Sequence, residues 1–359
     1  MADGTTSRIP ILNSFPFSYI VCHDLLYMNS KMKFSVIIPN YNYGRFVGRA
    51  IESALAVAWP DLEVIVVDDG STDNSRDVIE RYGNRIIAIF QPNRTQRVAC
   101  NTGFARATGD AVIFLDSDDI LMPDIAAEVA AIWSDRVSKV QVQMMRIDRE
   151  GNPTGGVFPI YDPMPTPALI RSWATETSAY PTPPGSGNVY SRKFLERIFP
   201  LDDFCGTFSD SACLAAAPFL GDVVTISKPL VQYRVHGQND SNLLSNYARF
   251  GREVARADAR WKFARKTAEA AGIALSENNI FKSLHLLQLR VASLRLAPAT
   301  HPLVDDSRQR AMRDAWQAVW SFPAMPMKRR LIVGTWAALT LVVPKPLAVR
   351  LISLRFAQR

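Results

Sequence analysis

The chain has 359 residues, more than one typical domain and fewer than three. Hydrophobic residues make up 48% and charged residues 21%, which is typical of a globular protein with a core and excludes extensive disorder. The formal net charge of +7 favours an anionic partner, such as nucleic acid, a phosphate-bearing ligand or an acidic membrane surface.

Residues 1–32 precede the first run with a strand pattern, and we expect a flexible N-terminal extension there. Their apolar stretch is interrupted by Asn13, His23 and Asp24, which is not the pattern of a secretory signal. The cysteines show neither a CxxC spacing nor a nearby histidine, so we expect buried, reduced thiols rather than a zinc site. These features predict a cytoplasmic protein.

Four continuous apolar runs predict strands that are buried on both faces, at 34–38, 62–67, 86–90 and 111–115. Helical patterns lie between them, at 47–58, 74–82 and 98–107. This β-α-β repetition predicts an α/β fold with an open, mostly parallel sheet flanked by helices. Ligands of such sheets bind beyond the carboxyl ends of the strands, so the residues that follow each strand are the candidates for function.

An acidic cluster, Asp116 to Asp119, follows the fourth predicted strand directly. Carboxylates this close raise one another's pKa unless a cation lies among them. A hard divalent cation with oxygen ligands, Mg²⁺ or Mn²⁺, would remove the repulsion and could also hold a diphosphate. The alternative is that Asp118 or Asp119 caps a following helix.

Polar residues also follow the first two strands. Asp68 and Asp69 could form an ordinary Asp-Gly-Ser turn, or could accept hydrogen bonds from a nucleobase or ribose. Tyr41 could pack against its neighbours or offer its ring to a base. Neither a G-x-G-x-x-G nor a P-loop motif occurs here, which argues against dinucleotide dehydrogenases and P-loop enzymes.

Beyond residue 240 the sequence becomes helical, and we place a domain boundary there, with a C-terminal helical region at 241–359. Within it, Leu331 to Val343 form a run of thirteen uncharged residues flanked by cations. Thirteen is fewer than the roughly twenty residues that span a bilayer. The pattern of residues 327–359 therefore predicts either a tail in the interface of an anionic membrane or a helical subdomain packed on the core.

Three ordered motifs, FSVIIPNYN at 34–42, VIVVDDGSTD at 64–73 and FLDSDD at 114–119, together resemble the inverting family 2 glycosyltransferases of GT-A fold. The resemblance covers residues 33–240, which would form the catalytic domain. It implies that Pro39, Tyr41 and Asp69 border the nucleotide base, and that Asp116 and Asp118 form a DxD pair at the metal and the diphosphate. The residues that we further assign to nucleotide-sugar binding are Asn42, Asp68, Arg97, Ser117 and Gly187.

Two later segments extend the resemblance. Asp210 opens a helical pattern where the family has its general base, although a helix N-cap is the alternative. His236 lies in a Tyr-Arg-x-His-Gly element, which implies a role at the metal, although a structural histidine is the alternative. The sequence departs from the family pattern at Thr95, Cys100 and Ser209.

The resemblance implies transfer of a sugar from a nucleotide-diphosphate sugar, with a UDP-sugar expected, to a glycan or lipid-linked acceptor with inversion. A cytoplasmic protein, peripheral on the inner membrane face, would suit cell-surface polysaccharide or glycoconjugate synthesis. The alternatives are a catalytically inactive sugar-nucleotide-binding scaffold and a sugar-phosphate nucleotidyltransferase. We expect no nucleic-acid partner, because the chain lacks an aromatic and basic platform.

Overall fold

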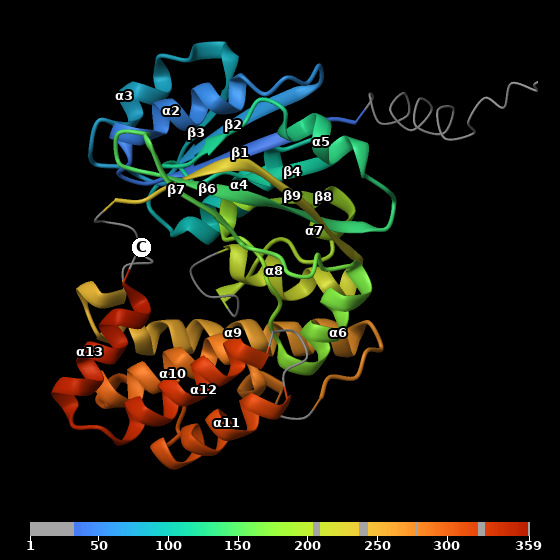
Figure 1. The fold of residues 1–359 in the computed structure, drawn as a ribbon. Coiled ribbons are helices and arrows are strands. Elements are labelled where there is room, and N and C mark those ends of the chain that lie inside the picture. The colour runs from blue at the N-terminus through green and yellow to red at the C-terminus, as the bar shows by residue number, and fades with distance from the viewer. Residues whose placement is uncertain (1–31, 204–208, 237–242, 277–278, 322–326, 358–359) are drawn as a thin grey trace, which may run out of the picture.

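The computed structural model describes residues 32–203, 209–236, 243–276, 279–321 and 327–357. Figure 1 shows an upper α/β region and a lower group of helices, α9 to α13. Most of the expected N-terminal extension and the expected domain boundary near residue 240 lie outside the described residues.

One mixed sheet forms the α/β region, with the order β3-β2-β1-β4-β8-β6-β9-β5 and with β7 paired to β6. Its strands are β1 (Phe34–Asn40), β2 (Leu62–Asp68), β3 (Ile87–Phe90), β4 (Ala111–Phe114), β5 (Ile120–Leu121), β6 (Val137–Ile147), β7 (Pro153–Phe158), β8 (Asn188–Ser191) and β9 (Asp222–Arg234). The four expected strands are present, and β1 pairs in parallel with both β2 and β4. The second half of the sheet mixes directions, because β8 runs antiparallel to β4 and β6 while β6 and β9 are parallel.

Helices cover both faces of the sheet, which explains why β1 is continuously apolar. Val36 and Ile38 share one core with Val47 of α2 (Gly44–Leu55), whereas Ile37 faces the opposite core with Phe104 of α4 (Gln96–Arg106). Successive side chains of a strand point to opposite faces, so apolar side chains are favoured on both faces of this strand. The remaining helices of this region are α3 (Ser75–Glu80), α5 (Ile125–Ala131), α6 (Pro167–Thr177), α7 (Arg192–Leu195) and α8 (Ser209–Leu220).

The C-terminal helices are α9 (Ala248–Ala270), α10 (Leu284–Leu296), α11 (Arg308–Ser321), α12 (Met327–Val342) and α13 (Lys345–Phe356). One face of the last two is buried, since Val333 and Ala337 of α12 share a core with Val291 of α10, and Ile352 of α13 packs with Leu289. Among the described helices, we find none that combines the length and apolarity needed to cross a bilayer. One face of each of these helices therefore packs within the C-terminal helical region, and the choice between a membrane-interface tail and a subdomain packed on the catalytic core stays a prediction.

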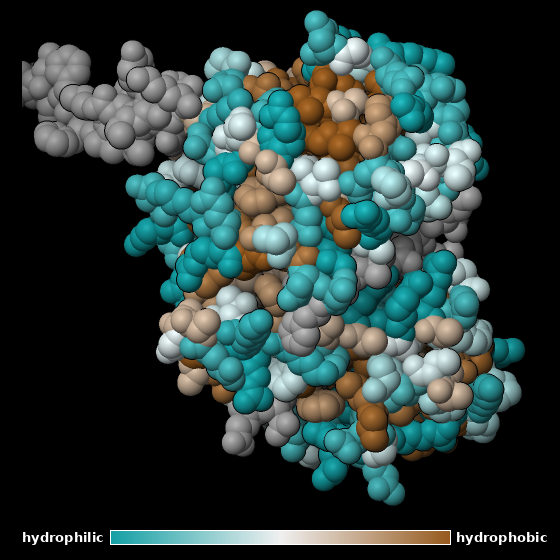
Figure 2. All heavy atoms as spheres, turned by 180° about the vertical axis from the view of Figure 1, so that it is seen from behind, coloured by the Kyte–Doolittle hydropathy of each residue, from teal (hydrophilic) through white to brown (hydrophobic). Residues whose placement is uncertain are grey.

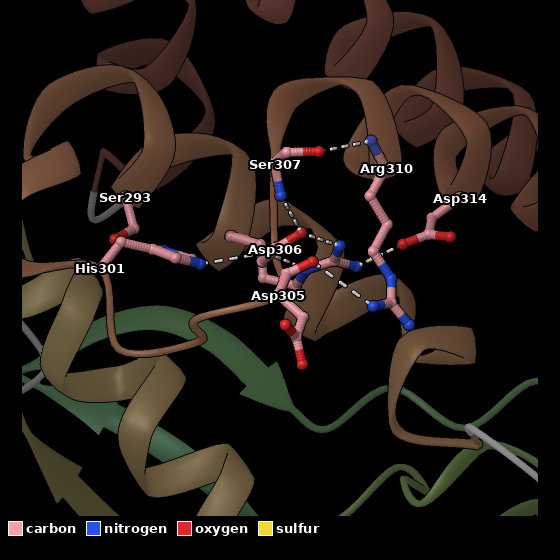
Figure 3. Close-up of polar contacts among 8 residues, drawn as sticks. Ser293, His301, Asp305, Asp306, Ser307, Arg310 and Asp314 are labelled. Atoms are coloured by element: carbon pink, nitrogen blue, oxygen red, sulfur yellow. Dashed lines mark hydrogen bonds and ion pairs between the residues drawn. The ribbon is translucent and has the colours of Figure 1, made fainter.

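A buried ion-pair network holds the loop before α11 against α10 (Figure 3). The Arg290 guanidinium donates from Nε to Oδ2 of Asp306 at 2.7 Å and from Nη1 to Oδ2 of Asp314 at 2.7 Å. His301 Nε2 lies 3.1 Å from the same Asp306 oxygen. Burial alone would raise the pKa of Asp306, but hydrogen bonds from Arg290 and His301 outweigh it and hold that pKa below its usual range.

Candidate active site

A cleft of about 450 Å³ opens at the carboxyl ends of β1, β2 and β4. In the sheet order β1 lies between β2 and β4, so the chain leaves β1 on one side and returns on the other, the arrangement that opens a crevice in α/β sheets. The side chains that line it include Pro39, Tyr41, Asp69, Asp116, Ser117, Asp118 and Asp210. Seven of the residues selected from the sequence therefore meet in one cleft.

Asp68 and Asn42 hold the loop after β2 and do not line the cleft. Asp68 is buried and accepts hydrogen bonds at Oδ1 from Asn40 Nδ2 at 2.8 Å and from Ser71 Oγ at 2.6 Å. Asn42 accepts from the Thr72 amide at 2.7 Å. These contacts fix the turn beside the cleft, and the expected contact of Asp68 and Asn42 with the nucleotide stays a prediction.

Asp69 lines the cleft, and its carboxylate also holds the loop that follows β3. Its Oδ1 accepts from Gln91 Nε2 at 2.6 Å and from the Arg94 amide at 3.0 Å. Gly70 adopts φ +73°, and a Cβ there would lie 2.6 Å from the Asn93 nitrogen, so this position requires glycine. The Asp-Gly sequence thus brings two loops together beside the cleft.

Tyr41 and Ser117 connect the ends of β1 and β4. The Tyr41 side chain is 47% exposed at the cleft, so part of its ring is open to a ligand. Ser117 Oγ donates to the Pro39 carbonyl at 2.8 Å and ties the two strand ends together.

Asp116 lies at the centre of the negative charge in the cleft. Burial is the largest cause that raises its pKa to about 8, and the carboxylates of Asp118 and Asp210 add to the effect. Gln96 Nε2 donates to Asp116 Oδ1 at 3.1 Å, which lowers that pKa in part. Gly185 allows the close approach, since a Cβ there would lie 2.7 Å from Asp116 Oδ2.

Asp118 lines the cleft, and His236, which does not line it, contacts the Asp118 carboxylate. Oδ2 of Asp118 lies 2.9 Å from His236 Nε2, and the imidazole stacks on the Phe46 ring at 5.1 Å between centroids. His236 is buried and does not line the cleft, so this contact orients the carboxylate. Its expected role as a metal ligand stays a prediction.

Asp119, the last residue of the acidic cluster, is buried beneath the cleft. Its carboxylate accepts from Ser186 Oγ at 2.7 Å and from the Arg234 amide at 3.0 Å. Burial, together with Asp118 and Asp116, raises its pKa well above the usual range. Asp119 therefore joins the end of β9 to the turn before β8.

Asp210 lies in the first turn of α8 and lines the same cleft. Its charge acts on Asp116, which places the two carboxylates within electrostatic range of each other. The side chain of Ser209, where the sequence departs from the family pattern, lies outside the part of the chain that the structure describes in detail.

Two residues selected from the sequence point elsewhere. Arg97 donates from Nη1 to the Leu201 carbonyl at 2.7 Å and pairs with Asp203, so its charge is directed away from the cleft. Gly187 is buried, and a Cβ there would meet Pro183 at 2.6 Å, whereas Gly185 is the glycine at the cleft. Their expected contacts with the donor stay predictions.

Sequence reasoning missed Gln96, Tyr190 and Tyr233, which line the cleft beside the expected residues. Gln96 opens α4 after Thr95, whose φ of +88° is unusual for a residue with a side chain. The residue types in this turn do not by themselves indicate its unusual backbone conformation. Within the described ranges, no group of three or more His, Cys, Asp or Glu side chains is arranged to hold a metal ion by itself.

A mixed sheet between helices, with carboxylates at the ends of β1, β2 and β4, is the arrangement expected of a GT-A glycosyltransferase, and the fold class is confirmed. The family model described as glycosyl transferase family 2 matches residues 35–199. Residues 35–199 are therefore a domain of this family.

Relatives of known sequence agree with that assignment. An uncharacterized glycosyltransferase of Nostoc sp. is 40% identical over 216 residues, covering 58% of this chain and 66% of the relative, just under two thirds. A chondroitin synthase of Escherichia coli is 38% identical over 134 residues, covering 35% of this chain and 20% of the synthase. A crystal structure of residues 1–349 of S. aureus TarS aligns with a TM-score of 0.49 and 16% identity, covering 91% of this chain and 92% of that one.

Proposed function

We propose that the protein transfers a sugar from a nucleotide-diphosphate sugar, with a UDP-sugar as the expected donor, to an acceptor hydroxyl with inversion at the anomeric carbon. The observation that carries this proposal is the meeting of Asp116, Asp118 and Asp210 around one cleft. Two of these carboxylates suit a diphosphate with its cation, and the third, on a different element, suits the acceptor.

The nucleotide would lie at the ends of β1 and β2. Tyr41 offers a partly exposed ring on which a base can stack, and Pro39 and Asp69 line the cleft beside it. The Asp69 carboxylate already accepts hydrogen bonds from two donors, one of them shared between both oxygens, and a carboxylate has room for about four. It therefore retains the capacity to accept a hydrogen bond from a base or ribose.

The residues present fit a divalent cation. Asp116 is buried beside two other carboxylates, and its pKa is raised mainly by burial and further by those carboxylates, so a bound cation would favour its ionised form. Mg²⁺ typically uses one or two carboxylates together with substrate phosphates, so a preformed set of three protein ligands is not required. Asp116 and Asp118 would hold Mg²⁺ or Mn²⁺, with His236 orienting Asp118. When bound, the ion would supply charge neutralisation to the departing diphosphate.

Asp210 would act as the general base. A sugar hydroxyl is a poor nucleophile, and Asp210 would accept its proton as the oxygen attacks the anomeric carbon and the bond to the diphosphate breaks. The reaction is a single displacement, so a second catalytic carboxylate at the sugar is not needed. The start of α8 fixes Asp210 on an element separate from the donor-binding strands.

The biological setting that we propose is cell-surface polysaccharide or glycoconjugate synthesis, with a glycan or lipid-linked acceptor. The similarity to a chondroitin synthase supports a role in polymer synthesis. The helical region exposes large apolar side chains, among them Trp316, Trp320, Leu331, Ile332, Leu339 and Leu354. Figure 2 shows hydrophobic patches among hydrophilic side chains on the lower half of the molecule. With a net charge of +7, this supports a cytoplasmic protein that attaches to an anionic membrane face.

Thermal unfolding of the full chain with a panel of nucleotide sugars, each with Mn²⁺, with Mg²⁺ or with a chelator, tests the donor and the cation. A ligand at 100 times its Kd stabilises the folded state by about 2.7 kcal/mol, which is readily measured. Hydrolysis of the stabilising donor then separates an enzyme from a binding scaffold. A protein that binds donors but neither hydrolyses nor transfers them would contradict the proposed activity.

A further inference from the structure

A second cavity, of about 440 Å³, lies between the α/β region and the C-terminal helices. Its walls come from the connection at 159–182, from α6 and α8, and from α9, α10 and α12 of the helical region. We call it the interlayer cavity. Nothing in the proposed donor chemistry uses it.

Most of the wall is apolar and aromatic. Trp173 of α6, Phe219 of α8 and Leu284 of α10 are buried side chains that face this space. Tyr180 adds its ring, and its Oη donates to the Leu214 carbonyl at 2.7 Å, so it is fixed in place. Such a lining favours an apolar chain rather than a free sugar or an ion.

Two guanidinium groups interrupt the apolar wall, Arg260 from α9 and Arg329 from α12. Among the described residues, no ion pair joins either of them to an acidic side chain, and Arg260 Nε is buried without a hydrogen-bond partner. The acidic residue of the described lining is Asp162, which is exposed and therefore screened by water. The described lining residues therefore carry two arginine charges against one exposed carboxylate, which is a net positive charge.

Two neutral polar groups, His285 and Tyr161, also line the cavity and add no negative charge. His285 faces the cavity, and burial together with Arg260 and Arg355 lowers its pKa to about 4, so it is neutral at pH 7. Tyr161 also lines the cavity, and its Oη is buried without a partner in the described part of the chain. A neutral imidazole and a phenol can both donate hydrogen bonds to an anion.

The first turn of α12 adds positive charge beside the cavity. Lys328, Arg329 and Arg330 stand at the end of the helix where the dipole is positive, and that turn contains no acidic residue. Cations there are unfavourable for the helix itself. The arrangement becomes favourable when an anion is bound beside them.

The interlayer cavity and the catalytic cleft share α8. Asp210, in its first turn, lines the cleft, while Leu214, four residues later, lines the cavity. Four residues correspond to about 6 Å along a helix axis. The connection before β8 also serves both, with Thr182 at the cavity and Gly185 at the cleft.

We propose that the interlayer cavity binds the phosphate and the adjoining apolar carbons of a lipid-linked acceptor, with Arg260 and Arg329 on the phosphate. This rests on the proposed transferase function and names its acceptor class. The apolar chain occupies the aromatic wall, and the sugar carried by the phosphate extends along α8 towards Asp210. The exposed position of Arg329 places the entrance at the basic end of α12.

The test is calorimetric titration of the full chain with decyl phosphate, kept below its micelle concentration, with inorganic phosphate and decanol as separate arms. Arg260→Gln and Arg329→Gln are compared with Arg265→Gln, a matched control on α9 that pairs with Glu269 and does not line the cavity. Because Arg329 is exposed, its variant is expected to fold even if Arg260→Gln does not. Binding of UDP with Mn²⁺ is measured on every variant.

We expect decyl phosphate to bind the wild type and the control alike, and to bind about ten-fold or more weakly to each cavity variant, since a charge-assisted contact is lost. Equal binding of inorganic phosphate would reduce the cavity to a phosphate site and overturn the lipid-linked assignment. Equal binding of decanol, or an equal loss in Arg265→Gln, would overturn the role of the two arginines. Failure of UDP to bind the wild type would count against the transferase function separately.

Discussion

At the residue scale, the ionisation of Asp116 reports on the charges around it. Burial is the largest cause that raises its pKa to about 8, and Asp118 and Asp210 add to it, so the carboxyl is mostly protonated at pH 7 in the ligand-free protein. Asp118→Asn removes one of these charges, and we expect the pKa of Asp116 to fall by about one unit or less, since the charge–charge part is smaller than burial. Carboxyl ¹³C NMR titration without divalent ions measures it. An unchanged titration would mean that the two groups do not interact.

Asp210 is the residue on which catalysis depends in the proposed mechanism. A positioned base contributes about 10²–10⁴-fold, so Asp210→Asn should lower transfer by two orders of magnitude or more while donor binding survives. Ser211→Ala is the matched control, because its hydroxyl makes only a 3.5 Å contact with Asp210 Oδ1. A transfer assay beside a donor titration reads both variants. Wild-type turnover in Asp210→Asn would refute the mechanism, and lost donor binding would move Asp210 into the nucleotide site.

The sequence located the cleft because acidic residues that directly follow apolar strands must project from the sheet edge, as Asp69, Asp116 and Asp118 do. It could not separate Asp68 from Asp69, since adjacent residues at a strand end point to opposite sides and either could face the ligand. It also could not place Arg97, whose partners Leu201 and Asp203 lie about a hundred residues away. Long side chains are directed by tertiary partners that residue type does not reveal.

At the element scale, the parallel half of the sheet was predictable because β1, β2 and β4 are largely buried and read as apolar runs, and the partly buried edge strand β3 is apolar as well. The other half of the sheet was not predictable from the sequence. β6 buries a lysine, Lys139, which donates to Gln141, Thr182 and Asn188 instead of an acid, and this interrupts the apolar pattern. Burial lowers the pKa of that lysine well below its usual range.

The contact between α10 and the loop before α11 depends on Arg290. Asp306→Asn would leave this fully buried guanidinium without its bidentate partner, and breaking a buried pair typically costs about 3–5 kcal/mol. Asp314→Asn, which removes a single contact at a less buried carboxylate, is the matched control and should cost about 1–2 kcal/mol. Urea unfolding at pH 7 measures both free energies of unfolding. Equal losses would show that the bidentate geometry is not what stabilises the contact.

The same network has a defined pH dependence. The pKa of Asp306 is lower in the folded than in the unfolded chain, where it is about 3.9. Its contribution to stability is therefore fully present above that value and is lost as the pH falls towards the folded pKa. The difference between the wild type and Asp306→Asn should be constant from pH 7 to pH 5 and shrink below about pH 4. A difference that shrinks already at pH 6 would contradict the assignment of this pH dependence to Asp306.

At the scale of the whole molecule, the helical region both buries and exposes apolar residues. Val333, Ala337 and Leu341 of α12 enter a core, whereas Leu331 and Ile332 remain about half exposed beside the basic first turn. A run of thirteen uncharged residues is compatible with both faces, so the sequence alone left a membrane surface and a packed subdomain open. Packing accounts for one face and leaves the other exposed.

The exposed face of α12 gives the test of membrane attachment. Leu331→Glu with Ile332→Glu replaces two exposed apolar side chains by charges that an anionic surface repels, at about 1 kcal/mol per charge before the lost apolar contact is counted. Affinity for vesicles that contain anionic lipid should fall about ten-fold or more, and wild-type affinity should weaken as salt rises. Val304→Glu is the control, because Val304 is fully exposed in a loop away from the basic turn in sequence. Co-sedimentation measures binding, and circular dichroism verifies that the variants fold. If the double variant binds as the wild type does, α12 serves the packed helical region alone, and a lipid-linked acceptor must reach the interlayer cavity without help from this surface.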